Sequence, residues 1–462
     1  MTEAPASHRP AAVRDSAPPT IAALASGRGR AGVAVIRVSG SRAGEAACAL
    51  GAGRVLKTPR QARLVALRHP ESGELLDHAL VLWFPAPRSY TGEDVVEFHV
   101  HGGPAVIAAV LDALTALPGV RLAEPGEFTR RAFEHGRMDL AAAEGLLDLV
   151  AAETEAQRRQ ALAQTAGLLG ARITGWQEQV LDAAARIEAL LDFADEEIGD
   201  EDDIVAAVDT ILARLGGQMA SALADAARGR RIREGLKVVI LGPPNAGKST
   251  LLNALAAEDV AIVSPEPGTT RDAITVRLDL AGVVVAFVDT AGLRAAAGAV
   301  EEEGIRRAHR HAREADLALW LVPADEQEDI PPPPDMGERP LWHVRTKQDL
   351  VPDLPAGRQD AERFVISART GAGMDALLSA LGSWVEAVTA GPPALVTRRR
   401  QEDAVAEARE ALAEARAQLA AGDWLLAAEA LRRADAALGR ITGRGGVEEM
   451  LDRLFAEFCI GK

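Results

Sequence analysis

Apolar positions recur with two different periods along this chain. Between residues 20 and 136, short apolar runs alternate with glycine-rich turns, so Val33–Val38 and Val95–Val100 predict strands. Ala105–Leu117 carries the longer helical period and precedes a Pro-Gly pair, which predicts a helix that ends there. We therefore interpret residues 20–136 as a small α/β domain.

A helical period dominates the next stretch of the chain. It runs almost continuously from Asp139 to about Arg231, with interruptions near Gly167–Gly170 and at the acidic run Asp192–Asp203. The same period returns over Arg398–Leu438, which we interpret as amphipathic helix, and a shorter helix is predicted over Val447–Phe458.

Between these helical parts, strands alternate with helices from Lys237 to about Leu381, which predicts a doubly wound, mostly parallel sheet. Helices of similar composition flank this α/β segment, so we predict one helical domain interrupted by an inserted domain. The expected protein is multidomain, with α/β and all-α parts. Its predicted segments are a disordered lead-in (1–19), an N-terminal α/β domain (20–136), a helical domain (137–234 and 386–462) and the inserted domain (235–385).

Composition narrows the class of protein. Hydrophobic residues make up 48% and charged residues 26% of the 462 residues, as in a globular protein. The chain contains no run of about 18 apolar residues, so we predict no membrane span. The net charge of −16 argues against nucleic-acid binding over the whole surface, although it is compatible with a local basic patch. Cys48 and Cys459 form no CxxC pair, which fits a reducing cytoplasm.

A phosphate-binding motif lies at the start of the inserted domain. Gly242–Ser249 matches G-x-x-x-x-G-K-[ST], follows the predicted strand Lys237–Leu241 and opens the predicted helix Thr250–Ala257. Glycines let backbone N–H groups surround phosphates, which the helix N-terminus also faces. We expect Lys248 to neutralise the outer phosphates and the Ser249 hydroxyl to bind Mg²⁺.

Two further segments have the pattern of GTPase switch regions. Gly268–Asp272 offers Thr270 as a residue that reaches Mg²⁺ and the terminal phosphate. Asp289–Gly292 ends the predicted strand Val283–Val288, so Asp289 is expected to hold Mg²⁺ through water and Gly292 to bond the terminal phosphate.

Two more segments predict the recognition of guanine. Thr346–Asp349 follows the predicted strand Leu341–Arg345; Asp349 would accept hydrogen bonds from guanine N1 and N2, and Lys347 would lie along the base. The backbone of Ser367–Arg369, after the predicted strand Arg363–Ile366, would meet guanine O6. Five motifs in this order at strand ends predict a GTPase.

The motifs depart from a common GTPase in two places. Thr346 stands where the base-reading segment usually has Asn, so we expect weaker nucleotide affinity with guanine selection retained by Asp349. Leu293 follows Asp289–Gly292, so the glutamine that orients the attacking water in many GTPases is missing. Hydrolysis must therefore use another group.

Four segments outside the nucleotide motifs carry a family resemblance: Thr20–Arg30, Ser89–Asp94, Ala123–Arg130 and the terminal Phe458–Lys462. Together they resemble the MnmE (TrmE) family of tRNA wobble-uridine modification GTPases, from about residue 20 to the last residue. The resemblance implies a tetrahydrofolate-binding and dimerising N-terminal domain, a discontinuous helical domain and an inserted Ras-like GTPase domain.

The resemblance also implies a cytoplasmic homodimer that acts on tRNA. It would work with a FAD-dependent partner of the MnmG/GidA family, as a heterotetramer without a membrane. Together they add a carboxymethylaminomethyl-type group to carbon five of the wobble uridine of certain tRNAs, and a tetrahydrofolate derivative supplies the one-carbon unit. The partner would bring FAD and most of the tRNA contact, in agreement with the acidity of this chain.

By matching position, the resemblance implies folate contacts from Arg37, Glu97 and Lys462. Arg137 stands where the family often has lysine; it keeps the charge but alters the geometry. Folate presents a carboxylate tail and a donor-rich pterin, for which cations and one carboxylate are suitable partners. The alternative for Arg37 and Glu97 is an ion pair within the domain.

The resemblance further implies a potassium ion in place of an arginine finger, between GTPase domains paired across the dimer. Asn245 matches the potassium ligand, and Ser264, Glu266 and Thr269 complete the site. Glu301 matches the carboxylate that orients the attacking water, and its alternative role is that of an ordinary acidic residue at a helix start.

The predicted catalytic residues are then Glu301, Asn245, Lys248 and Thr270, and Ser249 and Thr270 are the predicted Mg²⁺ ligands. The complete nucleotide-binding set for GTP or GDP is Asn245, Ala246, Gly247, Lys248, Ser249, Thr250, Ser264, Thr269, Thr270, Asp289, Thr290, Ala291, Gly292, Thr346, Lys347, Asp349, Ser367, Ala368 and Arg369.

Two rival functions stay open at this point. A ribosome-assembly switch GTPase would bind RNA without performing chemistry, but such proteins usually append a basic module that this acidic chain does not show. The second rival function is that of a folate-binding protein whose GTPase activity is merely regulatory.

Overall fold

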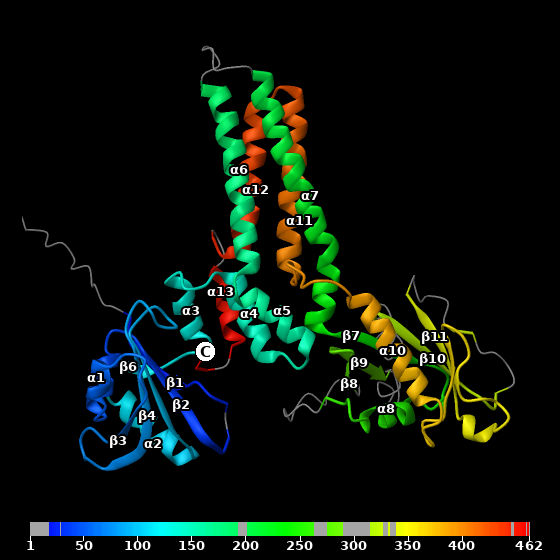
Figure 1. The fold of residues 1–462 in the computed structure, drawn as a ribbon, viewed down its shortest axis with the longest axis horizontal. Helices are drawn as coiled ribbons and strands as arrows, with labels where there is room; N and C mark the ends of the chain where they lie inside the picture. The colour runs from blue at the N-terminus through cyan, green and yellow to red at the C-terminus, as the bar shows by residue number, and fades with distance from the viewer. Residues whose placement is uncertain are drawn as a thin grey trace, which may run out of the picture. The chain divides into compact units, whose positions relative to one another are not determined.

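The fold divides into two compact units, Met1–Ala143 with Gly446–Lys462, and Glu144–Gly445. The structure is a computed structural model (Figure 1). It describes residues 18–27, 29–192, 201–262, 275–289, 315–326, 331–332, 339–444, 448–458 and 460–461, and at positions 289, 448 and 449 it describes the backbone alone. None of the described helices is both long enough and apolar enough to span a membrane.

The first unit is built on a six-stranded sheet of order β3-β4-β5-β2-β1-β6, antiparallel except for the β1–β6 pair. Its strands are β1 (Thr20–Leu24), β2 (Ala31–Ser39), β3 (Arg63–Arg68), β4 (Leu75–Phe84), β5 (Val95–Gly102) and β6 (Val120–Leu122). Helices α1 (Ala43–Ala49) and α2 (Pro104–Thr115) share one apolar core with this sheet. The predicted strands over β2 and β5 and the helix over α2 are confirmed.

Side chains alternate between the two faces of β2, as a strand requires. Ile36 and Val38 enter the core that α1 and α2 cover, so Arg37 points to the opposite face. That face holds a smaller apolar cluster in which Ile21 and Ala23 contact Phe128 of α3 (Glu127–Glu134).

The end of the chain returns to this same unit. Helix α13 (Glu448–Ala456) packs on α3, and the rings of Phe133 and Phe455 lie 6.4 Å apart. Ile460 then forms an antiparallel bridge with Pro125. A Cβ at Gly461 would lie 2.0 Å from the carbonyl oxygen of Leu24, and the φ of Gly461 is +102°, so only glycine lets the terminal segment approach β1 so closely.

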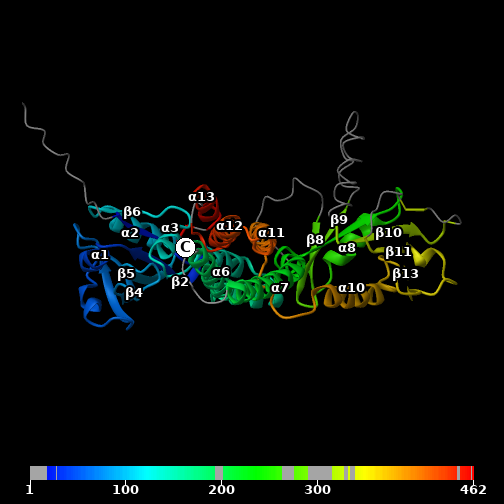
Figure 2. The same cartoon turned by 90° about the horizontal axis from the view of Figure 1, so that it is seen from above.

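The second unit contains a four-helix bundle. Helices α6 (Leu168–Asp192), α7 (Glu201–Glu234), α11 (Arg399–Ala421) and α12 (Trp424–Thr442) run side by side in Figures 1 and 2 and pack in the cyclic order α6-α7-α11-α12. Two shorter helices, α4 (Leu140–Ala151) and α5 (Glu155–Thr165), precede the bundle. The interruptions predicted near Gly167 and at the acidic run lie where α6 begins and ends.

The amphipathic helix predicted over Arg398–Leu438 is confirmed, but this stretch forms two helices. The structure divides this stretch at Gly422 and Asp423 into the neighbouring helices α11 and α12. Gly422 ends α11 in the left-handed conformation, and the Asp423 side chain accepts a hydrogen bond from the backbone N–H of Leu426. Both are ordinary helix-end signals, which the strong apolar period on either side concealed.

A buried carboxylate joins the helices on either side of the nucleotide segment. Glu144 of α4 accepts two hydrogen bonds of 2.6 Å from Arg400 and one of 2.8 Å from Gln401, both on α11. The Glu144 side chain is only 4% exposed. Because a charge in such surroundings depends on its partners, this cluster fixes α4 against the start of α11.

The sheet of the second unit has seven strands in the order β12-β13-β11-β10-β7-β9-β8. They are β7 (Leu236–Leu241), β8 (Thr275–Leu280), β9 (Val283–Asp289), β10 (Leu317–Pro323), β11 (Leu341–Thr346), β12 (Gly357–Arg358) and β13 (Arg363–Val365). The five inner strands are parallel, as predicted, and the edge strands β8 and β12 are antiparallel. Helices α8 (Lys248–Ala256) and α10 (Met374–Thr389) share a core with one face of the sheet.

The buried Glu144 cluster gives a stability prediction. We expect Glu144→Ala to lower the free energy of unfolding by about 3 kcal/mol, because it leaves the half-buried Arg400 without its counter-charge and the buried Gln401 without its acceptor. Asp209→Ala is the matched control, since it removes an exposed pair with Arg416 and should cost less than about 1 kcal/mol. Urea unfolding followed by circular dichroism measures both. Equal shifts in the two variants would contradict the assignment.

Candidate functional site

The phosphate loop lies at a switch point of the parallel sheet. Strand β7 lies between β9 and β10. The chain leaves β7 toward β8 and β9 but leaves β10 toward β11, so the connections from these two neighbouring strands run in opposite directions. The carboxyl ends of strands at such a point are where open α/β sheets bind ligands. The loop begins there, and α8 starts at Lys248 with its N-terminus toward the loop.

Backbone geometry shapes this loop. Gly247 and Asn245 both have positive φ, +87° and +63°, and a Cβ at Gly242 would lie 2.4 Å from the carbonyl oxygen of Leu321 on β10. The Lys248 side chain is buried, and its ammonium donates to the carbonyl oxygens of Gly242 and Pro243 at 2.9 and 2.8 Å. The ammonium therefore lies over the loop that is predicted to surround the phosphates.

The predicted base-reading segments meet at the neighbouring strand ends. The carboxylate of Asp349 accepts a hydrogen bond of 2.7 Å from the hydroxyl of Ser367, and the Gln348 N–H donates to the Ile366 carbonyl at 3.1 Å. Lys347 has a φ of +57°, which turns the chain at this point. Ala368 is half-buried, and the Arg369 guanidinium reaches within 4.0 Å of Asp349. The structure thus brings together two motifs that are separated by 18 residues.

Thr346 connects the base-reading segment to the phosphate loop. Its buried hydroxyl donates a hydrogen bond of 2.7 Å to the carbonyl oxygen of Ala246. This contact with the loop itself ties the two halves of the nucleotide site together.

Ser249 and Thr250 lie on the first turn of α8, and their side chains are exposed.

Several predicted site residues lie outside the described residues: Ser264, Glu266, Thr269, Thr270, Thr290, Ala291, Gly292, Glu301 and Lys462, together with Cys459. Asp289 is described through its backbone, which pairs in register with Ile240 at the end of β7. The last residue of β9 is thus adjacent to the strand that enters the phosphate loop.

In the first unit, Arg37 and Glu97 face each other on neighbouring strands. They are register partners in the β2–β5 pair, and their side chains form an ion pair of 3.0 Å. The guanidinium of Arg37 also lies over the rings of Tyr90 and Phe128, at 4.9 and 5.7 Å. Each partner is about one-sixth exposed, at 18% and 17%, so this charged pair is reachable at the surface. The ion pair that the sequence left as an alternative is therefore present.

Tyr90 and Phe128 were not among the predicted site residues. Both lie inside segments that carried the family resemblance, so the signal was available. Tyr90 shares a hydrogen bond of 2.7 Å with Thr129, and burial raises the pKa of its phenol. The buried ring of Phe128 supports the Arg37 guanidinium from below, and the partly exposed Tyr90 and Arg37 offer an aromatic and cationic surface to a ligand.

Of the other two predicted folate residues, the structure describes only Arg137. Arg137 is exposed, and its side chain lies beside Gly92 of the turn that contains Tyr90. Gly461, the residue before Lys462, contacts the backbone of Leu24, which pairs with Ile36. Gly461 thus lies against β1, the strand next to the one that carries Arg37.

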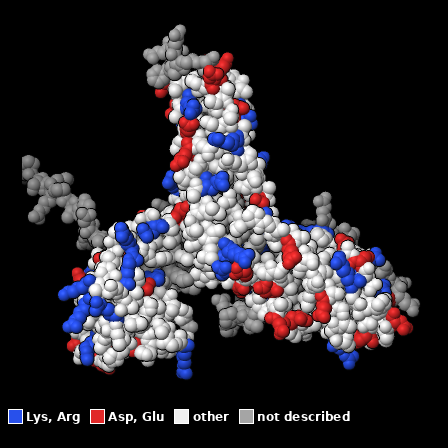
Figure 3. Space-filling model, in the orientation of Figure 1, with Lys and Arg blue, Asp and Glu red and all other residues white. Residues whose placement is uncertain are grey.

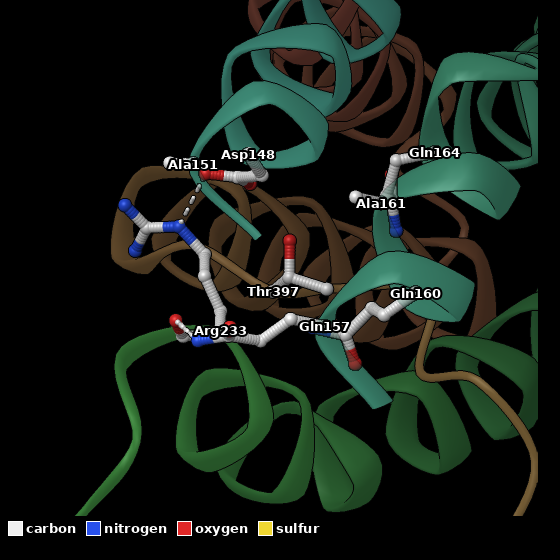
Figure 4. A pocket seen from close by; sticks show the side chains of 8 residues that line it. All are labelled: Asp148, Ala151, Gln157, Gln160, Ala161, Gln164, Arg233 and Thr397. Carbon is white, nitrogen blue, oxygen red and sulfur yellow. Dashed lines mark hydrogen bonds and ion pairs between the residues drawn. The ribbon is translucent and has the colours of Figure 1, made fainter. Parts of the chain in front are cut away.

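A separate pocket of about 50 Å³ lies within the helical part of the second unit (Figure 4). Asp148, Arg233, Gln160 and Gln164 are among its lining residues, and Arg233 donates to Asp148 at 3.1 Å. Burial raises the pKa of Asp148, opposed by Arg398 and Arg233. The volume suits about three water molecules and is far too small for a nucleotide or a folate.

A nucleotide-binding loop at the switch point of a parallel sheet, next to a helical bundle, defines a P-loop protein of the GTPase class. Two family models match the chain: GTP-binding protein TrmE N-terminus over residues 20–137, and MnmE helical domain over residues 140–459. The chain therefore belongs to the MnmE (TrmE) family.

Similar proteins span nearly the whole chain. The tRNA modification GTPase MnmE of Methylorubrum populi is 53% identical over 443 residues, which cover 96% of this chain and 98% of that protein. The protein of the same name from Azorhizobium caulinodans is 51% identical, with coverages of 96% and 99%. A mitochondrial 5-taurinomethyluridine tRNA synthase subunit of Homo sapiens is 46% identical, with coverages of 96% and 93%.

The Thr346 contact gives a prediction for nucleotide affinity. We expect Thr346→Val to weaken GDP binding by about 5- to 10-fold, because it removes the hydrogen bond to the Ala246 carbonyl at a cost of about 1–1.5 kcal/mol. Thr346→Asn should tighten GDP binding instead, because an amide reaches further and adds a second polar group. Isothermal titration calorimetry measures both values.

Thr389→Val is the matched control for this experiment. It removes a hydroxyl that bonds the Val385 carbonyl within α10 of the same domain. Its GDP affinity should equal that of the unchanged protein. If Thr346→Val also left the affinity unchanged, the proposed link between base reading and the phosphate loop would be wrong.

Proposed function

We propose that this protein is a GTP-hydrolysing enzyme of tRNA modification. With a FAD-dependent partner, it would add a carboxymethylaminomethyl-type group to carbon five of the wobble uridine of certain tRNAs. The observation that carries the proposal is the identity of 53% to a tRNA modification GTPase over 96% of this chain. The word subunit in the name of the human relative supports a partner protein.

In the proposed hydrolysis, the chain positions GTP and stabilises the charge that develops on its phosphates. Lys248, already held over the loop, would neutralise the outer phosphates, and Ser249 with Thr270 would hold Mg²⁺. Asp349 would select guanine, because a carboxylate accepts from both N1–H and the exocyclic amine. Glu301 would orient the attacking water in place of the missing glutamine.

A potassium ion is proposed to supply the charge that an arginine finger gives other GTPases. Asn245 would provide one ligand, and Ser264, Glu266 and Thr269 would provide the rest. Asn245 is exposed at the tip of the phosphate loop with a φ of +63°, which supports this placement beside the transferring phosphate. A second copy of the chain would close the site from the other side.

The proposed one-carbon donor is a tetrahydrofolate derivative held by the first unit. Arg37 and Glu97 support this assignment, since a cation and a carboxylate at 3.0 Å beside Tyr90 and Phe128 offer complementary groups to a pterin. Arg137 and Lys462 would bind the carboxylate tail. FAD would reside on the partner, of the MnmG/GidA family, in a heterotetramer formed with a homodimer of this chain.

Coupling between hydrolysis and the rest of the enzyme would pass through the β8–β9 hairpin. Arg277 of β8 forms a two-bond ion pair with Glu153, at 2.6 and 2.9 Å, and the Gly282 carbonyl accepts from the backbone of Ala156. Because β8 follows the Thr270 segment and β9 ends at Asp289, this hairpin connects both predicted switch segments to the helices α4 and α5.

We predict that replacing sodium by potassium raises the rate of GTP hydrolysis at least about tenfold, because the ion offsets charge in the transition state. Asn245→Ala should remove this dependence. Asn253→Ala, on the exposed side of α8, is the matched control and should keep it. Steady-state phosphate release in the two salts measures the effect. Equal rates in sodium and potassium would exclude the potassium proposal.

The proposed modification is tested by mass spectrometry of tRNA nucleosides. Cells that lack the gene should lose the modified wobble uridine, and the unchanged protein should restore it. Arg37→Gln should restore it poorly while keeping GTP hydrolysis, whereas the exposed Arg172→Gln should restore it fully. Unchanged nucleosides in the deletion strain would favour the rival ribosome-assembly or regulatory functions.

A further inference from the structure

One edge of the first unit gathers exposed cations that have no carboxylate among them. Between Glu45 and Glu71 the chain contains no acidic residue. It contains five cations there: Arg54, Lys57, Arg60, Arg63 and Arg68. Arg88 adds a sixth, because the Arg60 guanidinium donates to its backbone carbonyl. All six side chains are exposed, and we name this group the β3 patch.

The β3 patch contrasts with the rest of an acidic protein. Figure 3 shows Lys and Arg gathered over the region of α1 and β3, at the left of Figure 1, with few acidic side chains between them. Among the described residues, no carboxylate lies within ion-pair distance of any of the six. Three of them bond neutral groups instead: Arg60 donates to the Arg88 carbonyl, Arg63 to the Thr58 hydroxyl and Arg68 to the Gly73 carbonyl.

The fold holds this patch in place. Arg63 and Arg68 lie at the two ends of β3, the edge strand that pairs with β4, and Arg54 and Lys57 lie on the short helix η1 (Gly53–Lys57). The Arg60 backbone donates to the Trp83 carbonyl, and its guanidinium lies 5.7 Å from the Phe84 ring. Like charges on one edge with no carboxylate beside them repel one another, so this arrangement is favourable when an anion neutralises it.

The chemistry of the β3 patch favours phosphates. Five of its six members are arginines, whose planar guanidinium matches phosphate oxygens bidentately. Exposed aromatic rings on which bases could stack are scarce, since Trp83 is buried and Phe84 is half-buried. Such a surface binds a sugar–phosphate backbone with little regard to sequence.

We propose that the β3 patch binds the phosphodiester backbone of RNA and positions tRNA on this subunit. The inference rests on the proposed function, which makes tRNA the RNA concerned. It adds a tRNA contact on this chain to the contact expected from the partner. The acidity of the whole chain is compatible with it, because binding depends on the local density of cations.

The test measures binding of a fluorescent, unmodified tRNA transcript to the full-length protein by anisotropy at several salt concentrations. Arg54→Gln with Lys57→Gln should weaken binding about tenfold or more near 0.1 M salt and flatten the slope of log K against log salt by about 1.5. The control is Arg172→Gln with Arg409→Gln, which removes the same charge from exposed helical positions. It should bind like the unchanged protein, and both variants should hydrolyse GTP normally.

Two results would overturn the proposal. One is equal tRNA binding by the patch variant and the control. The other is displacement of the tRNA by polyglutamate as effectively as by unlabelled tRNA at equal charge, which would assign the patch to an acidic protein. The proposed function is judged separately by the tRNA nucleosides of the deletion strain. If that strain lost the modified uridine while the patch variant still bound tRNA like the unchanged protein, only the β3 patch would be ruled out.

Discussion

The structure of the second unit depends on the buried contact between Glu144 and the helix start at Arg400. Those two residues are 256 positions apart, and the whole nucleotide-binding segment lies between them. Closing so long a loop costs conformational entropy, which the contact and the surrounding bundle offset. Because α7 precedes the segment and α11 follows it within one bundle, both ends of the nucleotide sheet are held by the same helices.

That arrangement gives the nucleotide site a rigid base. Strand β7 continues directly from α7, and Asp316 accepts hydrogen bonds from Arg231 on the helix and from the backbone of Lys237 on the strand. At the carboxyl ends of the strands, the phosphate loop and the base-reading turn meet through the hydrogen bond from Thr346 to the Ala246 carbonyl. A change in the predicted switch segments would therefore act against a fixed frame, and the β8–β9 hairpin is the element through which it would reach the helices.

Local signals in the sequence were enough to predict much of this fold. The phosphate loop, the parallel inner strands and the breaks around α6 depend on residues close together in the chain, and the structure places them as expected. The break at Gly422 was also a local signal, but the alanine- and leucine-rich period on both sides outweighed it. The order of the five nucleotide motifs at strand ends further predicted a GTPase domain.

Contacts across long separations could not be predicted in the same way. The pairing of Arg37 with Glu97 depends on the register between β2 and β5, and the aromatic neighbours Tyr90 and Phe128 come from two further segments. Nothing in the sequence indicated that Thr346 would bond the phosphate loop. Five cations of the β3 patch lie in a stretch of sequence without acidic residues, but whether carboxylates from other segments neutralise them depends on the fold.

The central claim is that the nucleotide state of the α/β domain reaches the helices through the β8–β9 hairpin. Hydrogen–deuterium exchange of the full-length protein, with GDP and then with a non-hydrolysable GTP analogue in potassium, tests it most directly. The account predicts that exchange changes both in residues 275–282 and in residues 153–158, where Glu153 and Ala156 contact the hairpin. Changes confined to the loops that bind the nucleotide would contradict it.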